Sequence, residues 1–310
     1  MTWRFITRHF HWLAGLVLGV LFHLAHADPT LTAFPPFRLG IVNERLDRPD
    51  FALRQYGKLH ARLLETLARH NIQTAPLVVS DDMAKIAEKF TSGALDAVIE
   101  GVMPTLRIQQ RTGVLEPTLL VWRKGQRQYH SVFFVRKDSP FDTLESLRGQ
   151  TIVFESPRST SAFFVPLVTL KGQGLSVLPA TTETLDAGAV RYEFAESELN
   201  QAYWVHRGKA HAGAFNDGDW QRVPEIIRKD LRIIAQTPPL LRWLFSFHTD
   251  VDPRIKQAVT EALVAMHETK PGREALQAAE NIVQFEPLSA ADIDSLAHWR
   301  KQLSHLDSTL

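Results

Sequence analysis

Short apolar runs rich in β-branched residues alternate with stretches of helical spacing along most of this chain. The runs "FRLGIVN" (37–43), "APLVVS" (75–80) and "DAVIEG" (96–101) have the length of buried strands, while residues 51–70 and 81–91 have the spacing of helices. This alternation predicts an α/β fold in which a mostly parallel sheet carries helices on both faces.

The same alternation resumes after residue 128, which indicates a second α/β unit of similar build. Strands are expected at "YHSVFFVRK", "TIVFE", "VRYEF" and "AHAGAFN", with a short helix from Thr143 and helices after Ser159 and over 197–207. The last third returns with "LRIIAQT" and "RWLFSFH", followed by helices near 253–267, 271–279 and 290–304 that we expect to pack on the first unit.

The order of these elements predicts two lobes, because the chain leaves the first unit and later returns to it. We expect lobe 1 to comprise residues 28–128 and 236–310, and lobe 2 to comprise residues 129–235. The two crossing segments, "TLLVWRKGQRQYHSV" and "RIIAQTPPLLRW", are the candidates for a hinge.

The N-terminus has the pattern of a secretory signal. Arg4 and Arg8 precede an apolar run that ends in the small residues Ala25 and Ala27 around His26, so cleavage is expected before Asp28, leaving residues 1–27 as the signal peptide. The apolar run is too short to span a membrane, which needs about 20 residues. The sequence therefore predicts an exported protein that is soluble outside the cytoplasm.

Composition excludes several classes of function. Removing residues 1–27 takes away two arginines and no acidic residue, so the formal net charge falls from +1 to −1, and no polybasic surface for nucleic acid is indicated. The absence of cysteine excludes disulfides, thiolate metal sites and a lipid-anchored N-terminal cysteine. No H-E-x-x-H or G-x-S-x-G motif is present and no acid/base pair is evident, so we expect no cofactor, no metal and no enzyme activity.

Three adjacent hydroxyl residues, Ser159, Thr160 and Ser161, lie where a strand leads into a helix. Capping the helix explains one such side chain, because a hydroxyl satisfies an unpaired backbone N–H of the first turn. The alternative is an anion site, because those N–H groups and the helix dipole attract negative charge. The residues alone leave both interpretations open.

The stretch from Val121 to Leu175 is closely similar to the solute-binding proteins of phosphate, phosphite and phosphonate ABC transporters. The shared elements are a Y-x-S-V strand, a K-D-S-P turn, a "tLesLrG" segment and the Ser-Thr-Ser triplet before an apolar helix. In this chain they are Tyr129, Ser131, Val132, Lys137, Asp138, Ser139, Pro140, Leu147, Gly149 and Ser159–Ser161.

This resemblance implies a two-lobed periplasmic-binding-protein-like fold of class II, with a ligand cleft between the lobes. It also implies that Ser159, Thr160 and Ser161 hold the oxygens of a phosphorus oxyanion, and that Tyr129 contacts the ligand. The partners it implies are a small anionic ligand and an ABC permease, and we expect the protein to be a monomer.

The chain also departs from the family pattern. Ala162 replaces a glycine, Met83 replaces a lobe 1 tyrosine, and Glu198 stands where relatives carry histidine. Relatives that bind aminophosphonates hold the ammonium with acidic residues.

Near one of those acidic positions this chain has Asp217 and Asp219, slightly out of register, and near the other it has Arg242. An arginine cannot hold an ammonium but suits a bidentate contact to an oxyanion. We therefore predict an anion without an amine, with Glu198, Asp217 and Arg242 as further candidate ligand residues. The alternative is an extracytoplasmic sensor of the same fold that acts on a signalling receptor.

Overall fold

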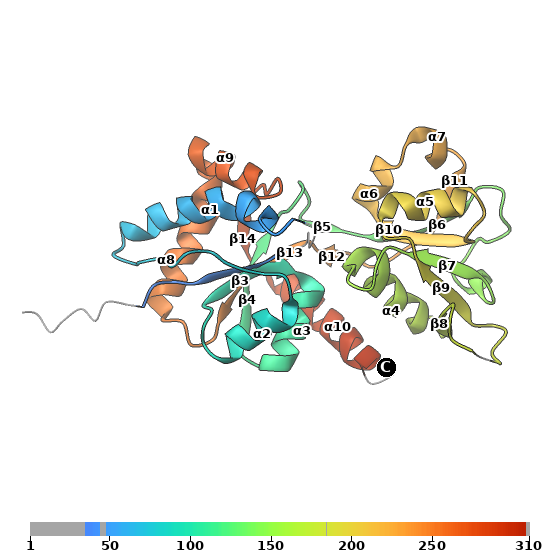
Figure 1. The fold of residues 1–310 in the computed structure, drawn as a ribbon, viewed down its shortest axis with the longest axis horizontal. Coiled ribbons are helices and arrows are strands. Elements are labelled where there is room, and N and C mark those ends of the chain that lie inside the picture. Colours follow the sequence, from blue (N-terminus) through green and yellow to red (C-terminus); the bar gives the residue numbers. More distant parts are fainter. Residues whose placement is uncertain (1–34, 44–47, 184, 308–310) are drawn as a thin grey trace, which may run out of the picture. The chain divides into compact units, whose positions relative to one another are not determined.

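The computed structural model describes residues 35–43, 48–183 and 185–307, and these form two six-stranded sheets and a two-stranded ladder (Figure 1). The first sheet has the order β14-β4-β13-β3-β1-β2, and the second has the order β11-β6-β10-β7-β9-β8. The predicted signal peptide, residues 1–27, lies outside the described residues. Within the described residues, no helix combines the length and apolar composition needed to cross a membrane.

The strands of the first sheet are β1 (Leu39–Val42), β2 (Val78–Ser80), β3 (Ala97–Gly101), β4 (Leu115–Val121), β13 (Trp243–His248) and β14 (Phe285–Pro287). Those of the second are β6 (Ser131–Arg136), β7 (Thr151–Phe154), β8 (Val177–Pro179), β9 (Val190–Phe194), β10 (Ala212–Asn216) and β11 (Leu231–Gln236). The helices are α1 (Phe51–Ala68), α2 (Met83–Thr91), α3 (Val102–Thr112), α4 (Val165–Gly172), α5 (Glu198–His206), α6 (Asp217–Arg222), α7 (Glu225–Arg228), α8 (Pro253–Val264), α9 (Lys270–Ala278) and α10 (Ala290–Asp307).

The sheets are mixed rather than mostly parallel. β1 pairs in parallel with β2 and β3, and β7 pairs in parallel with β9 and β10, as the alternation of strands and helices predicts. β13 is antiparallel to both β3 and β4, and β6 is antiparallel to both β10 and β11. The antiparallel strands adjoin the crossing segments, where the chain enters or leaves a sheet without a crossover helix.

The second sheet has helices on both faces because its central strands are apolar on both sides. Phe133 and Val135 of β6 pack in one core cluster with α4, whereas Val132 and Phe134, one residue out of phase, pack in another with α5. Successive side chains of a strand point to opposite faces, so a continuous apolar run requires a covering helix on each side. Figure 1 shows α4 and α5 on opposite sides of this sheet.

The sequence analysis assigns no helix to Val102–Thr112, yet α3 fills this range. The helix follows β3 without a loop and ends at Gly113, whose left-handed φ of 69° forms the C-cap. The helix predicted for 81–91 begins two residues later, because Asp82 is its N-cap and accepts a hydrogen bond from the Ala84 amide at 2.7 Å. The short helix predicted from Thr143 is a single 3₁₀ turn, Glu145–Leu147.

The two crossing segments pair with each other. β5 (Gln128–Tyr129) and β12 (Leu240–Leu241) form an antiparallel ladder, and the Arg242 amide extends it by donating to the Arg127 carbonyl at 2.9 Å. Strands of the first sheet come from residues 39–121 and 243–287, and those of the second from residues 131–236. The lobe boundaries remain a prediction, as does hinge motion at the ladder.

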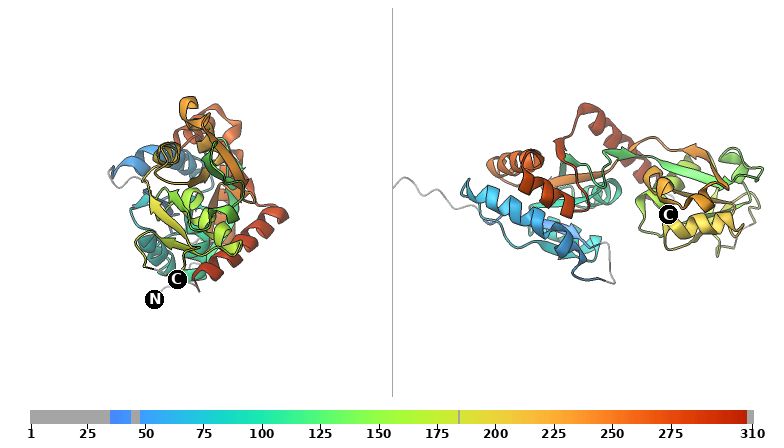
Figure 2. Two further views of the ribbon diagram at one scale, coloured as in Figure 1. Left: turned by 90° about the vertical axis from the view of Figure 1, so that its right-hand side faces the viewer. Right: turned by 90° about the horizontal axis from the view of Figure 1, so that it is seen from above.

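The last helix does not pack on lobe 1 elements alone. α8 and α9 lie against α1 as expected, but α10 contacts α3, α4 and β12 (Figures 1 and 2). Its Leu296, Trp299 and Leu303 are buried in a core cluster that also contains Leu106 of α3 and Val165 of α4. This helix therefore joins elements of both predicted lobes beside the crossing segments.

We expect Trp299→Ala to lower the free energy of unfolding by about 3–5 kcal/mol, because it leaves a cavity where α10 meets both α3 and α4. Chemical denaturation of the ligand-free protein measures the change. The matched control is His298→Ala, since His298 is exposed on the same helix and should change stability by about 0.5 kcal/mol or less. Equal effects of the two substitutions would contradict the packing described for α10.

Candidate functional site

The Ser159–Ser161 turn lies between β7 and a helix, as the sequence predicts. Ser159 is the N-cap, and its hydroxyl accepts a hydrogen bond from the Ala162 amide at 3.1 Å. The first turn, Thr160–Phe164, is π-helical, with the Phe164 amide donating to the Ser159 carbonyl at 3.0 Å. Such π turns are frequent at functional sites.

Capping accounts for Ser159 but not for its two neighbours. The Thr160 and Ser161 side chains are half-buried, and their hydroxyls have no hydrogen-bond partner among the residues that the structure describes. The backbones of both residues are held in place: the Thr160 carbonyl accepts a hydrogen bond from the Val165 amide, and the Ser161 carbonyl accepts one from the Ser131 hydroxyl at 2.8 Å. Two hydroxyl groups at the start of a helix therefore form no hydrogen bond within the described part of the chain and can donate to a ligand.

The candidate residues of the second sheet lie along one edge because they follow neighbouring parallel strands. Ser159 follows β7, Glu198 follows β9 at the start of α5, and Asp217 follows β10 at the start of α6. Ser131, the first residue of antiparallel β6, pairs with Asn216 at this same edge. The carboxyl ends of parallel strands are where α/β sheets place their ligands.

Tyr129 and Arg242 meet on the ladder between the sheets. The Arg242 guanidinium carbon lies 4.9 Å from the centroid of the Tyr129 ring, and the two residues are only 8% and 4% exposed. Burial lowers the pKa of Arg242 and raises that of Tyr129, because it disfavours the charged form of each side chain.

The Arg242 guanidinium has no acidic partner among the described residues, and its Nε has no hydrogen-bond partner. An arginine stays protonated in proteins, so the charge remains although its environment opposes it. A buried charge without a partner is costly, and a bound anion would remove that cost.

The acidic residues near the strand ends are mostly engaged with the protein itself. Asp217 accepts hydrogen bonds from the Gln126 side-chain amide at 3.2 Å and from the Gly218 backbone amide at 2.9 Å. Asp219 forms an ion pair with Arg222. Glu198 is half-buried, and its pKa is raised by burial and by the nearby charge of Asp219.

A second arginine stacks on an aromatic ring on the lobe 1 side. Arg123 lies 3.9 Å above the Trp243 ring, whose other contact is a parallel stack with Tyr56 at 6.5 Å. Arg123 is also paired with Glu280 at 2.6 Å in a buried ion pair. Trp243 is therefore held between Arg123 and Tyr56, whereas Trp204 and Trp220 pack in the lobe 2 core.

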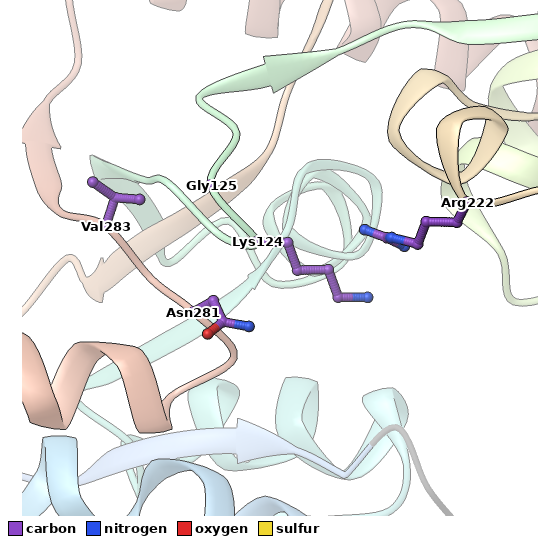
Figure 3. Close-up of a pocket in the computed structure, with 5 residues that line it drawn as sticks. All are labelled: Lys124, Gly125, Arg222, Asn281 and Val283. Carbon is purple, nitrogen blue, oxygen red and sulfur yellow. The ribbon is translucent and has the colours of Figure 1, made fainter.

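An open pocket of about 510 Å³ lies between the crossing segment and α6. Figure 3 shows that the side chains of Lys124 and Arg222 extend toward each other across it, with Asn281 directed into the same space. Gly125 and Val283 complete the lining. The sequence analysis missed these cations: the basic run "WRKGQR" was the available signal, and nothing in the sequence indicates that it faces Arg222.

Comparison with known proteins identifies the family. Residues 49–293 match the sequence profile of the family described as "ABC transporter, phosphonate, periplasmic substrate-binding protein". No curated protein sequence matches the chain.

Solved structures share the fold. XAC2383 from Xanthomonas citri bound to chloride is 25% identical, with a TM-score of 0.78 over 88% of this chain and 99% of that one. PhnD1 from Prochlorococcus marinus in complex with methylphosphonate is 16% identical, with a TM-score of 0.59 over 86% and 98% of the two chains. The aliphatic sulphonate binding protein SsuA from Escherichia coli is 14% identical, with a TM-score of 0.52 over 88% and 92%.

The chain shares the two-lobed periplasmic-binding-protein fold that the resemblance implies, and the Escherichia coli neighbour is a periplasmic binding protein for aliphatic sulphonates. The profile covers most of the chain, including both sheets and the Ser159–Ser161 turn. The chain belongs to the phosphonate-binding family of periplasmic ABC transporter substrate-binding proteins.

Proposed function

We propose that this substrate-binding protein captures a small phosphorus oxyanion, such as a phosphonate, phosphite or phosphate, whose organic part carries no ammonium group. The family description concerns phosphonates, and XAC2383 holds a chloride ion, so both lines of similarity point to an anion. The proposal includes export with cleavage before Asp28, a monomeric state, delivery to an ABC permease and no catalysis.

The observation that carries the proposal is the buried, unpaired guanidinium of Arg242. It is 8% exposed and has no carboxylate partner in the described chain, although other arginines of the crossing segments do. A ligand anion would supply the missing charge, and a guanidinium can donate two parallel hydrogen bonds to two oxygens of one oxyanion.

The hydroxyls of Thr160 and Ser161 are the second group of donors that we assign to the ligand. Hydrogen bonds to a charged group contribute about 1.5–3 kcal/mol each, and micromolar affinity needs about 8 kcal/mol in total. Two hydroxyls, the two bonds of Arg242 and the backbone amides at the start of the π turn are sufficient for that affinity. Closure of the lobes at the β5–β12 ladder would bring these groups onto the ligand and present the closed form to the permease.

The state of the carboxylates supports a ligand without an amine. Asp217 and Asp219 are held by Gln126 and Arg222, and burial raises the pKa of Glu198 because it disfavours the charged carboxylate. An ammonium group requires an exposed, ionised carboxylate close to the anion site. In the proposed site Arg242 takes that place, and its charge would repel an ammonium.

Replacing Arg242 tests directly whether its buried, unpaired guanidinium binds the ligand. Arg242→Met should weaken binding of methylphosphonate at least about tenfold, measured by calorimetry, because a charged hydrogen-bonding pair is lost. The ligand-free protein should keep or increase its free energy of unfolding, since the substitution removes an uncompensated buried charge.

The matched control is Arg127→Met. Arg127 is paired with Glu286 at 2.6 Å and with the buried Asp292 at 2.7 Å, so its replacement should destabilise the ligand-free protein. If Arg242→Met destabilised the protein as much as Arg127→Met and left affinity unchanged, the arginine would be structural and the proposal wrong.

The hydroxyl triplet divides into a capping residue and two ligand residues, and substitutions separate them. Ser159→Ala should lower the free energy of unfolding by about 1 kcal/mol through loss of the cap. Thr160→Val together with Ser161→Ala should leave the melting temperature almost unchanged but weaken methylphosphonate binding about tenfold or more. Unchanged affinity of the double variant would leave capping as the whole explanation of the triplet.

The ligand class is tested first by thermal shift, because a ligand bound by the native state alone raises the melting temperature. We expect phosphite or methylphosphonate to raise the melting temperature of residues 28–310 more than 2-aminoethylphosphonate does at equal concentration. Sulfate and methanesulfonate are the matched controls, because they have sulfur in place of phosphorus as the central atom of the oxyanion. A larger shift with the aminophosphonate would overturn the exclusion of an amine, and shifts with the sulfur oxyanions alone would overturn the phosphorus assignment.

A further inference from the structure

The pocket lined by Lys124 and Arg222 has a rigid floor. Lys124 and Gly125 are the central residues of a tight turn closed by the Arg123–Gln126 bridge, with left-handed φ values of 55° and 77°. The Lys124 amide donates to the Glu280 carbonyl at 3.1 Å, which fixes this turn to the loop after α9. A lysine accepts a left-handed backbone only where the surroundings impose it, so its position is well determined.

The opposite wall is fixed to the same turn. The Gln126 side chain donates to Asp217 at 3.2 Å and lies against Gly218, which places α6 beside the turn. Arg222, the last residue of α6, extends from this wall toward Lys124 in Figure 3. Its ion pair with Asp219 occupies only part of the five N–H donors of a guanidinium.

The pocket adjoins the anion site. The turn at Lys124 leads within a few residues to Tyr129, and Asp219, the partner of Arg222, lies near enough to influence Tyr129 and Arg242. The two places are nevertheless formed by different side chains, because none of the pocket residues belongs to the Ser159–Ser161 turn or to the β5–β12 ladder.

Size and charge indicate what the pocket accepts. Its volume of about 510 Å³ falls within the range of about 300–1,000 Å³ typical of sites for larger organic ligands, well above the needs of phosphite or methylphosphonate. Its lining contains two cations, one amide side chain and no acidic residue. Cations on facing walls of a concave site concentrate anions there.

We propose that this pocket is a second anion subsite, which receives a distal acidic group of a ligand whose phosphorus oxyanion is held by Arg242 and by the hydroxyls of Thr160 and Ser161. The ligand class is then an organophosphonate or phosphate ester that carries a second anionic group. The inference rests on the proposed function, because it requires the phosphorus end to be bound in the adjoining site.

The test compares ligands of equal length that differ at the distal end. Phosphonoacetate, 3-phosphonopropionate and 4-phosphonobutyrate are each titrated by calorimetry beside the alkylphosphonate of matching chain length. For at least one length, we expect the acid-ended ligand to bind about threefold to tenfold tighter, with a preference that falls as salt is added. Lys124→Gln and Arg222→Gln should each reduce this preference toward equality while changing alkylphosphonate affinity less than about twofold.

Two further variants separate charge from structure. Arg228→Gln, an exposed α7 arginine paired with Glu225 outside the pocket, should leave the preference unchanged. Asp219→Asn removes the acidic partner of Arg222 but leaves the charge of Arg222 in place. The preference for the acid-ended ligand should therefore persist or grow. Equal binding of acid-ended and alkyl-ended ligands at every length, or a preference that survives both pocket substitutions, would overturn the subsite. Failure of all these phosphonates to bind would instead refute the proposed function, and the subsite with it.

Discussion

The short antiparallel ladder between Gln128–Tyr129 and Leu240–Leu241 is the constraint on which the rest of the site depends. It holds the two crossing segments side by side, so that the chain connects the two sheets twice at one place. The same ladder places Arg242 over Tyr129, two residues before the start of β6 in the second sheet. A displacement of this pairing by one residue would turn these side chains to the opposite face.

The arginines of the crossing segments differ in whether an acidic side chain pairs with them. Arg123 and Arg127 are neutralised by acidic residues of lobe 1, Glu280 for the first and Glu286 with Asp292 for the second. Arg242 is more deeply buried than Arg127 and has no such partner in the described chain. Internal pairs fix the segments to lobe 1, whereas the unpaired cation is the feature on which the proposed preference for an anion rests, since anion binding would remove the cost of the buried charge.

The π-helical turn separates the capping residue of the hydroxyl triplet from its two neighbours. Ser159 satisfies the helix, and the wide first turn leaves Thr160 and Ser161 with free hydroxyls at its start. Directly after them, Phe164 lies under the guanidinium of Arg107 from α3 at 4.8 Å. A ligand held at the triplet is therefore only a few residues from a contact that joins the second sheet's helix to an element of lobe 1.

Local pattern in the sequence was sufficient for the strand-to-helix turn at Ser159, for most strands and for the family, because periodicity, capping and motif order are properties of neighbouring residues. It was not sufficient for α3, which follows β3 without a turn signal, or for the antiparallel direction of β13, which depends on where the crossing segment returns. The tertiary structure alone decided which arginine lacks a partner, since Glu280 and Asp292 lie more than 150 residues from the arginines that they neutralise. Burial and charge pairing arise only when distant segments meet, and for that reason Arg242, Lys124 and Arg222 acquire their significance from the fold.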